Sequence, residues 1–504
     1  MTSTDVLICG AGAAGLTLAI ELARRDVGFV LIDKAPAPFG GSRGKGIQPR
    51  SQEVFEDMGV LDRMVAAGGR YPPQRAHQDG GATDEPMFEA LPPSPAEPYR
   101  TPLMLPQFLT EAILRERLLE LGHAPRFGRE LTGFTQDEAG VTAKIGSETV
   151  RARYLVGADG GRSFVRHALG IEFPGKTLGI RAVVADLVLD GLSDDAWHRW
   201  NDGAPEQLSL CPLRGTELFQ LQAPIPLDGD IDLTAQGLGA MITQRTGRAD
   251  IRVHAVTWAS AYSMNARLAD RYGIGRVYLA GDAAHIHPPT GGQGLNTSVQ
   301  DAYNLGWKLA AALNGAPAAV LASYEAERRP VAAEVLGLST RLLDALNRRG
   351  DMRRGRDTHQ LDLGYPDSPL SLKGNPSLAL QSGDRAPDAP CSGAGGQKTR
   401  LFNLFQGTHW TLLGCGTDRG AFRPRPGLHI HSTGPGGDIA DCCGHIRQVY
   451  APNAAAWVLV RPDGYVAAAV PPSDAAALDI LLECIGPLEE YVRGTQIGLT
   501  GTAP

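Results

Sequence analysis

The sequence has no long apolar run and no dense cluster of basic residues. No stretch approaches the roughly 18 consecutive apolar residues that a membrane-spanning helix needs. The densest basic segment, RRGDMRRGRD at 348–357, contains acidic residues and is typical of a solvated helix end or linker. The net charge is −7 at pH 7. These absences predict that neither a membrane nor a nucleic acid is a partner.

Cysteine is scarce and shows no functional spacing. The seven cysteines are scattered, none forms C-x-x-C, and only Cys442 and Cys443 are adjacent. Adjacent thiols suit neither a structural zinc site nor an ordinary disulfide. Because the apolar N-terminus also lacks a basic leader, this odd, scattered set predicts reduced thiols and a cytoplasmic protein. The missing redox pair argues against a disulfide reductase.

What the chain does contain, at its N-terminus, is a nucleotide-binding pattern. The apolar run DVLICG is followed by G-x-G-x-x-G, then by a helical pattern and a second apolar run that ends at Asp33. Glycines at such a turn let the backbone approach a pyrophosphate at a helix N-terminus, and the later acidic residue suits a ribose. The motif does not distinguish FAD from NAD. The predicted contacts are Gly10, Gly12, Ala13, Ala14, Gly15, Asp33 and Lys34.

Two later apolar runs also end in Gly and Asp, and no second strand–G-x-G-x-x-G–helix unit follows. The first reads RYLVGADGGRSFVR at 153–166 and the second RVYLAGDAAH at 276–285. With GAGAAG, SRGKGIQPRS and the longer segment GDAAHIHPPTGGQGLN, they occur in an order that resembles the single-component FAD-dependent aromatic hydroxylases, the family of para-hydroxybenzoate hydroxylase. The resemblance covers residues 1 to about 345. It implies FAD as cofactor and NADPH or NADH as a transient co-substrate.

The segment 281–296 supports that resemblance on physical grounds. A carboxylate at a strand end, as at Asp282, can accept hydrogen bonds from the ribityl chain of FAD, and the prolines and glycines leave room for a flat ring. The N-terminus of the following helix would stabilise an anionic reduced flavin. A metal at His285 and His287 is the alternative, but two ligands without an obvious third or fourth argue against it.

The resemblance also assigns roles to individual residues. Arg43 would contact the diphosphate and move with the flavin, and Gln107 would bind FAD at a helix start. Asp159 would serve both FAD and NADPH, with Arg166 as its ion partner or as a helix cap. Arg50 falls near the NADPH approach, or is a solvent-facing cation. The remaining implied cofactor contacts are Gln48, Gly281, Asp282, the Pro289 carbonyl, Gly292, Gly294 and the N–H groups of Leu295 and Asn296.

The implied reaction is the hydroxylation of an electron-rich aromatic ring by O2 through a flavin 4a-hydroperoxide. The cofactor carries the chemistry, so no catalytic triad is expected, and no substrate-activating base can be identified. A polycyclic polyketide or antibiotic-type substrate is favoured. Simple phenol hydroxylation and Baeyer–Villiger oxygenation of a polyketide stay open, as does a non-catalytic flavoprotein that binds a drug or senses redox state.

The expected fold class is α/β with three parts. A discontinuous FAD-binding, Rossmann-like domain of the glutathione-reductase type would comprise 1–72, 100–170 and 272–345, and a mixed-sheet substrate domain 73–99 and 172–271. A helix end and linker, 346–382, would lead to 383–504, which resembles a thioredoxin-like domain without C-x-x-C. The assembly would be a monomer or homodimer. The candidates for the pocket lining, by location only, are Phe219, Gln220, Gln222, Trp258, Tyr262 and Met264. For each of them, burial in a core is the favoured alternative.

Overall fold

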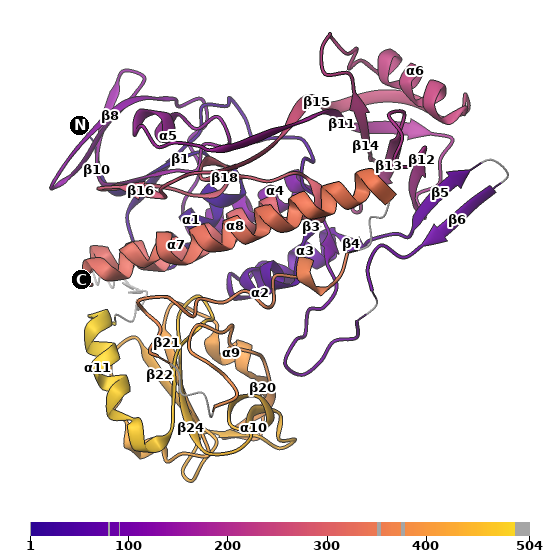
Figure 1. Ribbon diagram of the computed structural model, residues 1–504. Coiled ribbons are helices and arrows are strands. Elements are labelled where there is room, and N and C mark those ends of the chain that lie inside the picture. Colours follow the sequence, from indigo (N-terminus) through magenta and orange to yellow (C-terminus); the bar gives the residue numbers. More distant parts are fainter. Residues whose placement is uncertain (1, 79–80, 90, 350–353, 374–377, 489–504) are drawn as a thin grey trace, which may run out of the picture.

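The computed structural model describes residues 2–78, 81–89, 91–349, 354–373 and 378–488 (Figure 1). Three parts can be followed by colour: a sheet with helices formed largely by the N-terminal third, a second sheet beside it, and a yellow C-terminal unit below both. The chain is mixed α/β throughout.

The first sheet is parallel at its centre, as the buried apolar runs predict. β1 pairs in parallel with β10 and β2, and β10 pairs in parallel with β17. The antiparallel strands β16, β8 and β9 extend it. The strands are β1 (Thr2–Cys9), β2 (Phe29–Ile32), β8 (Leu131–Asp137), β9 (Gly140–Ile145), β10 (Glu148–Gly157), β16 (Gly273–Ile274) and β17 (Val277–Leu279).

Helices pack closely on this sheet. Every residue of α1 is buried, and α1 contacts both α4 and α7. A three-stranded sheet, ordered β3-β7-β4, pairs the segment before α2 with the segment before α4. These elements are α1 (Ala13–Ala23), β3 (Gly46–Ile47), α2 (Pro49–Asp57), α3 (Leu61–Ala67), β4 (Gly69–Arg70), β7 (Leu103–Met104), α4 (Gln107–Glu120), α5 (Phe164–Ala168) and α7 (Gly294–Leu313).

The second sheet has eight strands, ordered β18-β15-β11-β14-β13-β12-β5-β6. Its outermost strand, β18, belongs to the segment GDAAHIHPP, so one edge of this sheet reaches the sequence expected to carry the flavin. Helix α6 (Ala235–Thr246) packs against β13 and β15. The strands are β5 (Gln74–Gln78), β6 (Gly81–Glu85), β11 (Gly175–Asp190), β12 (Trp197–Trp200), β13 (Leu208–Pro212), β14 (Phe219–Ile225), β15 (Arg252–Leu268) and β18 (His285–Ile286).

The C-terminal unit has a four-stranded sheet, β22-β21-β24-β25, and a three-stranded sheet, β20-β19-β23. β24 and β25 form an antiparallel hairpin, and Gly464 at its turn has φ +76. The elements are β19 (Pro390–Gly393), β20 (Lys398–Arg400), α9 (Leu401–Phe405), β21 (Trp410–Cys415), β22 (Leu428–Ser432), β23 (Ile439–Ala440), α10 (His445–Tyr450), β24 (Ala456–Val460), β25 (Val466–Val470) and α11 (Ala476–Ile485).

The C-terminal unit is held to the rest by buried charges. Glu327, on the long helix α8 (Ala318–Arg349), accepts hydrogen bonds from Lys308 of α7 at 2.5 Å and from Arg461 at 2.7 and 2.9 Å. Arg461 also binds Asp463, and the side chains of all four residues are at most 1% exposed. Two cations therefore face two carboxylates across the junction.

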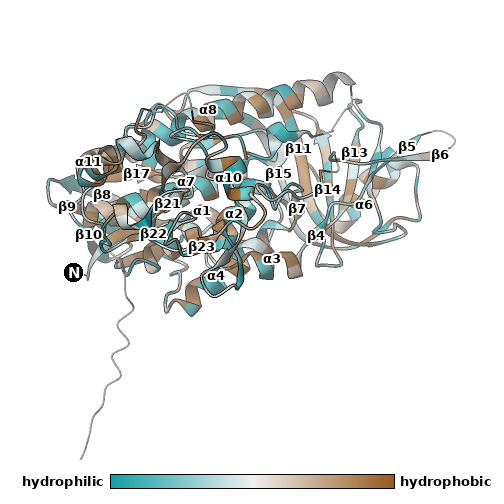
Figure 2. Cartoon of the chain, turned by 90° about the horizontal axis from the view of Figure 1, so that it is seen from below, coloured by the Kyte–Doolittle hydropathy of each residue, from teal (hydrophilic) through white to brown (hydrophobic). Residues whose placement is uncertain are grey.

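Figure 2 shows hydrophilic and hydrophobic residues alternating along α8, as expected for a helix that packs on one side only. Of the helices in the described part of the chain, none combines the length and apolar character required to cross a bilayer.

Candidate functional site

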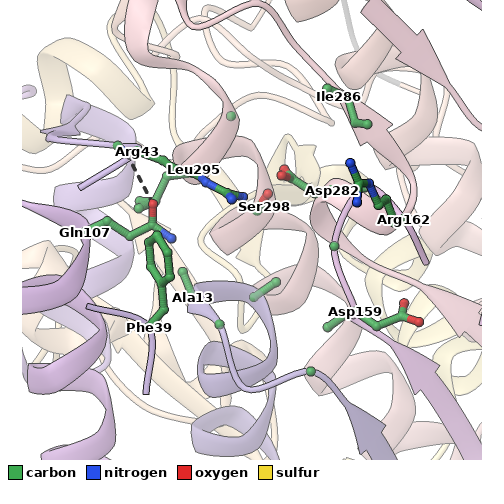
Figure 3. A pocket seen from close by; sticks show the side chains of 18 of the residues that line it. Ala13, Phe39, Arg43, Gln107, Asp159, Arg162, Asp282, Ile286, Leu295 and Ser298 are labelled. Carbon is green, nitrogen blue, oxygen red and sulfur yellow. Dashed lines mark hydrogen bonds between the residues drawn. The ribbon is translucent and has the colours of Figure 1, made fainter. Parts of the chain in front are cut away.

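A cavity of about 1330 Å³ lies between the two large sheets. Ligand pockets for one small molecule are commonly roughly 300–1,000 Å³, so this space can hold a dinucleotide and a second molecule. Figure 3 shows side chains entering it from several elements. The predicted residues that line it are Gly10, Gly12, Ala13, Ala14, Asp33, Lys34, Arg43, Gln107, Asp159, Asp282, Pro289, Gly292, Gly294 and Leu295.

Four predicted contacts do not line the cavity: Gly15, Gln48, Gly281 and Asn296. Gly15 acts through packing, because a Cβ there would lie 1.9 Å from the Gly10 carbonyl oxygen. Gly10 itself has φ +107, and its Cβ would lie 2.2 Å from the Ala158 carbonyl oxygen. Only glycine fits either position, so the turn is shaped by sterics as the motif predicts.

Two carboxylates line the cavity beside the glycine turn. Asp33 accepts backbone hydrogen bonds from Ala11 and Ala35, both at 2.8 Å, which fix its orientation beside the glycine turn. Glu111 was not predicted, yet it is buried, lines the cavity, and accepts a hydrogen bond from Gln107 at 2.8 Å. Burial raises the pKa of Glu111. The signal that could have found it is the four-residue spacing from Gln107 along one helix face.

Arg43 enters the cavity from the loop before β3 (Figure 3). Its guanidinium lies 5.4 Å from the Phe39 ring centre and 5.8 Å from that of Trp258, so two aromatic rings hold the cation without neutralising it. The neighbouring Gly44 N–H donates to Gln107 Oε1 at 3.2 Å. The loop and α4 are thereby joined at the cavity wall.

Asp282 lies in a short 3-10 turn, η1 (Gly281–Ala283), directly after β17. Its side chain faces the open cavity, as Figure 3 shows, although protein surrounds it on the other sides. Burial raises the pKa of Asp282, and His285 and Arg43 only partly offset this effect. A carboxyl that is exposed to a cavity is suited to binding hydroxyl groups of a ligand.

Behind this turn lies a buried hydrogen-bond network. His285 Nε2 is 2.6 Å from Asp301 Oδ2, and Arg328 Nε donates to Asp301 Oδ1 at 2.8 Å. Gly281 N–H also donates to Asp301, at 3.2 Å. Burial by itself would raise the pKa of Asp301, but His285 and Arg328 hold it below its ordinary value. His285 is therefore a hydrogen-bonding residue of the turn.

His287 differs from its neighbour. It lines the cavity and lies against His285, with ring centres 4.7 Å apart and ring planes tilted by 41°. Neither of its buried ring nitrogens has a partner among the described residues. Burial lowers the pKa of His287 well below its ordinary value, and the nearby His285 lowers it further. A neutral imidazole at the cavity wall results.

The floor of the cavity continues through Pro288 and Pro289, a turn η2 (Thr290–Gly292), and the N-terminus of α7. Asn296 ties this floor to β3: its side chain accepts from Gln48 N–H at 2.8 Å and donates to the Gly46 and Gly292 carbonyls. Gln48 is buried and donates to Gly291 O. Gln48 and the Asn296 amide thus position the floor, and the first N–H groups of α7 remain free of intrahelical partners.

Asp159 follows β10 and points into the cavity (Figure 3). One carboxylate oxygen accepts from Val165 N–H at 3.1 Å, and the other is buried with no partner in the described part of the chain. The ion pair expected with Arg166 does not form. Arg166 instead donates to the Ala283 and Gly161 carbonyls, because its side chain extends across the two cavity loops.

Arg50 lies neither in the cavity wall nor in solvent, the two positions predicted for it. The side chain is 5% exposed, pairs with Glu53 at 2.7 Å, and donates to the Asp463 carbonyl at 2.7 Å. Its guanidinium also lies over the Tyr465 ring. Arg50 therefore joins α2 to the C-terminal unit rather than meeting a nucleotide or solvent.

Two of the six side chains named by location on the second sheet, Gln222 and Tyr262, line the cavity. Burial raises the pKa of Tyr262 to about 12. Trp258 supports Arg43, whereas Phe219 and Gln220 are buried inside the protein. Met264 is half-buried and is not part of the cavity wall.

These donors and acceptors fit FAD. A glycine turn at the start of α1 suits a diphosphate, Asp33 suits a ribose, and Asp282 with the α7 N-terminus suits a polyhydroxyl chain that ends in a flat ring. Among the described residues one Asp159 oxygen has no partner and Arg43 has no ion pair, and a ligand in this cavity would satisfy both groups.

Comparisons with known proteins agree with that fit. Residues 3–339 match the family described as FAD binding domain. A "Flavin-dependent monooxygenase" of Mycobacteroides abscessus is 42% identical over 92% of this chain and 96% of its own length. A "12-dehydrotetracycline 5-monooxygenase/anhydrotetracycline 6-monooxygenase" of Streptomyces rimosus is 33% identical over 92% and 94%.

Solved structures are similar over nearly the whole chain. The flavin-dependent monooxygenase PieE in complex with FAD and substrate has a TM-score of 0.85 at 26% identity, covering 96% of this chain and 99% of its own. Aklavinone-11 hydroxylase with FAD and aklavinone has a TM-score of 0.80 at 28% identity, with the same coverage. The chain belongs to the FAD binding domain family. Within this family the protein is an FAD-dependent monooxygenase, as its sequence motifs predict.

Proposed function

We propose that this protein hydroxylates a polycyclic, polyketide-type aromatic substrate, with NAD(P)H as reductant and O2 as oxygen donor. The observation that carries the proposal is the single cavity that runs from the dinucleotide turn to Gln222 and Tyr262 of the second sheet. Relatives named for tetracycline intermediates, rifampicin and aklavinone support a substrate of several fused rings.

FAD, when bound, accepts reducing equivalents from NAD(P)H and activates O2. The chain's own part is to bind and orient. Asp33 would accept hydrogen bonds from the ribose, Arg43 would neutralise the diphosphate, and Asp282 would bind the ribityl hydroxyls. The remaining proposed contacts are the Pro289 carbonyl and the N–H groups of Leu295 and Asn296 at the flavin, with Gln107 and Asp159 along the cavity wall.

The neutral His287 has a further effect. It adds no charge to the cavity wall, and an uncharged part of the wall holds few waters. Exclusion of water limits the unproductive loss of activated oxygen as peroxide. Coupled turnover therefore depends on how completely the substrate fills the space.

The domain division proposed is the one expected from the sequence, with the first sheet in the FAD-binding part and the eight-stranded sheet in the substrate part. Strands of both 73–99 and 172–271 lie in that second sheet, which supports the assignment. A thioredoxin-like C-terminal domain, and a monomer or homodimer, remain part of the proposal.

The test is a substrate screen with the holoenzyme. NADPH and NADH oxidation would be followed with tetracyclic polyketides, anthraquinones and simple phenols, and products would be weighed by mass spectrometry. The expected result is faster oxidation with a polycyclic member and a product that gains one oxygen atom. Base-labile products would indicate Baeyer–Villiger oxygenation instead. Failure of every polycyclic compound to raise oxidation or to gain oxygen would overturn the proposal.

A further inference from the structure

A buried lysine, Lys45, lies at the end of the loop before β3, where this loop meets the second sheet. Lys45 lines the cavity and is 8% exposed. Its Nζ donates to Gln220 Oε1 at 2.5 Å and lies 4.0 Å from the centre of the Trp197 ring. An amide oxygen and an aromatic face stabilise a cation only partly, because neither carries a full negative charge.

No carboxylate pairs with Lys45 among the described residues. The nearest acidic group that acts on it, Asp186, is already bound by the N–H and hydroxyl groups of Ser42, the former at 2.8 Å. Burial lowers the pKa of Lys45; Cys211 and Asp186 oppose this effect, and Arg354 adds to it. Lys45 is therefore a buried amine whose charge is incompletely balanced by the protein.

A second cation faces the same region from the segment after α8. Arg354 lies over the Phe88 ring at 5.8 Å, and its Nη1 is 3.4 Å from the place where a Cβ on Gly292 would lie. Burial lowers the pKa of Arg354. In the described part of the chain Arg354 has no ion pair. Lys45 and Arg354 therefore both lie near the cavity floor without a matching anion from the described residues.

The groups between these cations do not supply negative charge. Burial raises the pKa of Cys211 to about 11, which leaves the thiol protonated at neutral pH. Burial also raises the pKa of Tyr71, whose hydroxyl donates to the Lys45 carbonyl at 3.1 Å. Tyr71 and Phe88 pack edge to face at 5.1 Å, and Trp197 lies on the Lys45 side. The surroundings are thus aromatic and neutral.

Unless a ligand supplies an anion, charge on Lys45 and Arg354 is unfavourable, because the described residues offer neither group a counter-charge. Under the proposed function the glycine turn beside α1 and Arg43 would take up the cofactor phosphates, so the anion for Lys45 is assigned to the second molecule. An aromatic molecule that bears an ionisable hydroxyl can supply this anion, since its oxygen can meet Lys45 at the cavity wall.

We propose that Lys45, supported by Arg354, binds an ionised hydroxyl, a phenolate or enolate, of the aromatic substrate. This inference rests on the proposed function, because it assigns the substrate class of the same site. If the amine is neutral, the hydroxyl proton passes to Nζ; if it is already an ammonium, the hydroxyl loses its proton to solvent. Either route gives the same ammonium–phenolate pair, and the ionised oxygen makes the ring richer in electrons where oxygen is to be added.

The test uses a probe whose colour reports its ionisation. A dihydroxyanthraquinone and its dimethyl ether would be titrated into oxidised holoenzyme, and the pKa of the bound probe would be measured by absorption across pH. Wild type would be compared with Lys45→Met, with the charge-preserving Lys45→Arg, with Arg354→Met, and with Lys144→Met as a matched control that removes an exposed lysine on β9.

Wild type is expected to lower the pKa of the bound probe by about one unit or more. Lys45→Met should remove that shift and weaken anion binding by about tenfold. Lys45→Arg should keep most of it, Arg354→Met should reduce it, and Lys144→Met should leave it unchanged. The dimethyl ether should bind wild type and Lys45→Met alike. Unchanged circular dichroism and FAD content would show that each variant folds.

Three results would overturn the inference. The bound probe could have the same pKa in wild type and in Lys45→Met; Lys45→Met could weaken binding of the dimethyl ether as much as binding of the ionisable probe; or the ionisable probe could fail to bind wild type. The proposed function is judged separately, by oxygen gain in the product. A Lys45-dependent pKa shift without oxygenated product would support the role of Lys45 and contradict the proposed function. Equal product from wild type and Lys45→Met, with no pKa shift, would support the proposed function and contradict the role of Lys45.

Discussion

Buried charges lie at both ends of helix α7, and they are balanced differently. Near its C-terminal end, Lys308 and Arg461 face Glu327 and Asp463, and every one of these side chains is paired. Near its N-terminal end, Lys45 and Arg354 flank the cavity, and the described residues offer them no ion pair.

The difference separates a structural role from a binding role. A paired network is complete in the free protein, and its function is to hold the C-terminal unit against α7 and α8. Unpaired cations beside a cavity are incomplete until a ligand arrives, because burial penalises a charge that has no counter-charge. Burial alone therefore does not identify a functional residue; the balance of charge and the access to a cavity do.

The largest expected effect tests the paired end. Arg461→Met would leave Glu327 and Asp463 buried without their main partner, and the free energy of unfolding should fall by about 3–5 kcal/mol, measured by urea denaturation. The bound-probe pKa described for Lys45 should not change in this variant. A loss of stability below about 1 kcal/mol would contradict the structural role of the network.

The next effect tests a carboxyl that faces the cavity instead of a partner. Asp282→Ala should weaken FAD binding by about ten- to a hundredfold, since hydrogen bonds to a charged group contribute about 1.5–3 kcal/mol. FAD dissociation would be measured by ultrafiltration and fluorescence. Asp270→Ala, which removes an exposed carboxyl, is the matched control. Equal FAD retention in both variants would refute the assignment of Asp282.

A smaller effect concerns pH and the neutral His287. Its folded pKa is lowered by burial, so below about pH 6.5 the unfolded chain binds a proton that the folded protein does not. Stability should therefore fall as pH falls through that value, by up to about 1.4 kcal/mol per pH unit for this group. His287→Gln should make the slope shallower between pH 6.5 and 5. Identical slopes would show that His287 is readily protonated in the folded state.

The smallest effect is expected at an exposed ion pair. Arg248 and Asp250 lie 2.5 Å apart on the surface, where water and salt screen their attraction. Arg248→Met should leave the melting temperature, FAD content and probe binding unchanged within error. A clear loss of stability in this variant would mean that pairing distance, rather than burial, governs the contrast between the two ends of α7.

Much of the FAD site follows from local sequence. The glycine turn, Asp33 and Asp282 were expected where they occur, because each motif combines a strand end, a steric requirement and a helix start within a few residues. Such short-range constraints can be recognised in the sequence without a structure. The parallel centre of the first sheet follows in the same way from the buried apolar runs.

The predictions that depended on long side chains were less successful. Arg166 and Arg50 carry three or more rotatable bonds and could reach several partners, and the structure directs them to carbonyl groups and to Glu53. Glu111, Lys45 and Arg354 were not predicted, because their significance arises from neighbours that are distant in sequence. Cys211 lies beside Lys45 only because β13 and the loop before β3 pack together.

The sequence by itself determined the cofactor class, the family, and the order of the strands and turns that receive the dinucleotide. Those features are set by sterics and hydrogen bonding between residues close along the chain. Only the tertiary structure decided which buried charges are balanced and which face the cavity. Electrostatic balance is a property of the space around a group, and that space is assembled from segments hundreds of residues apart.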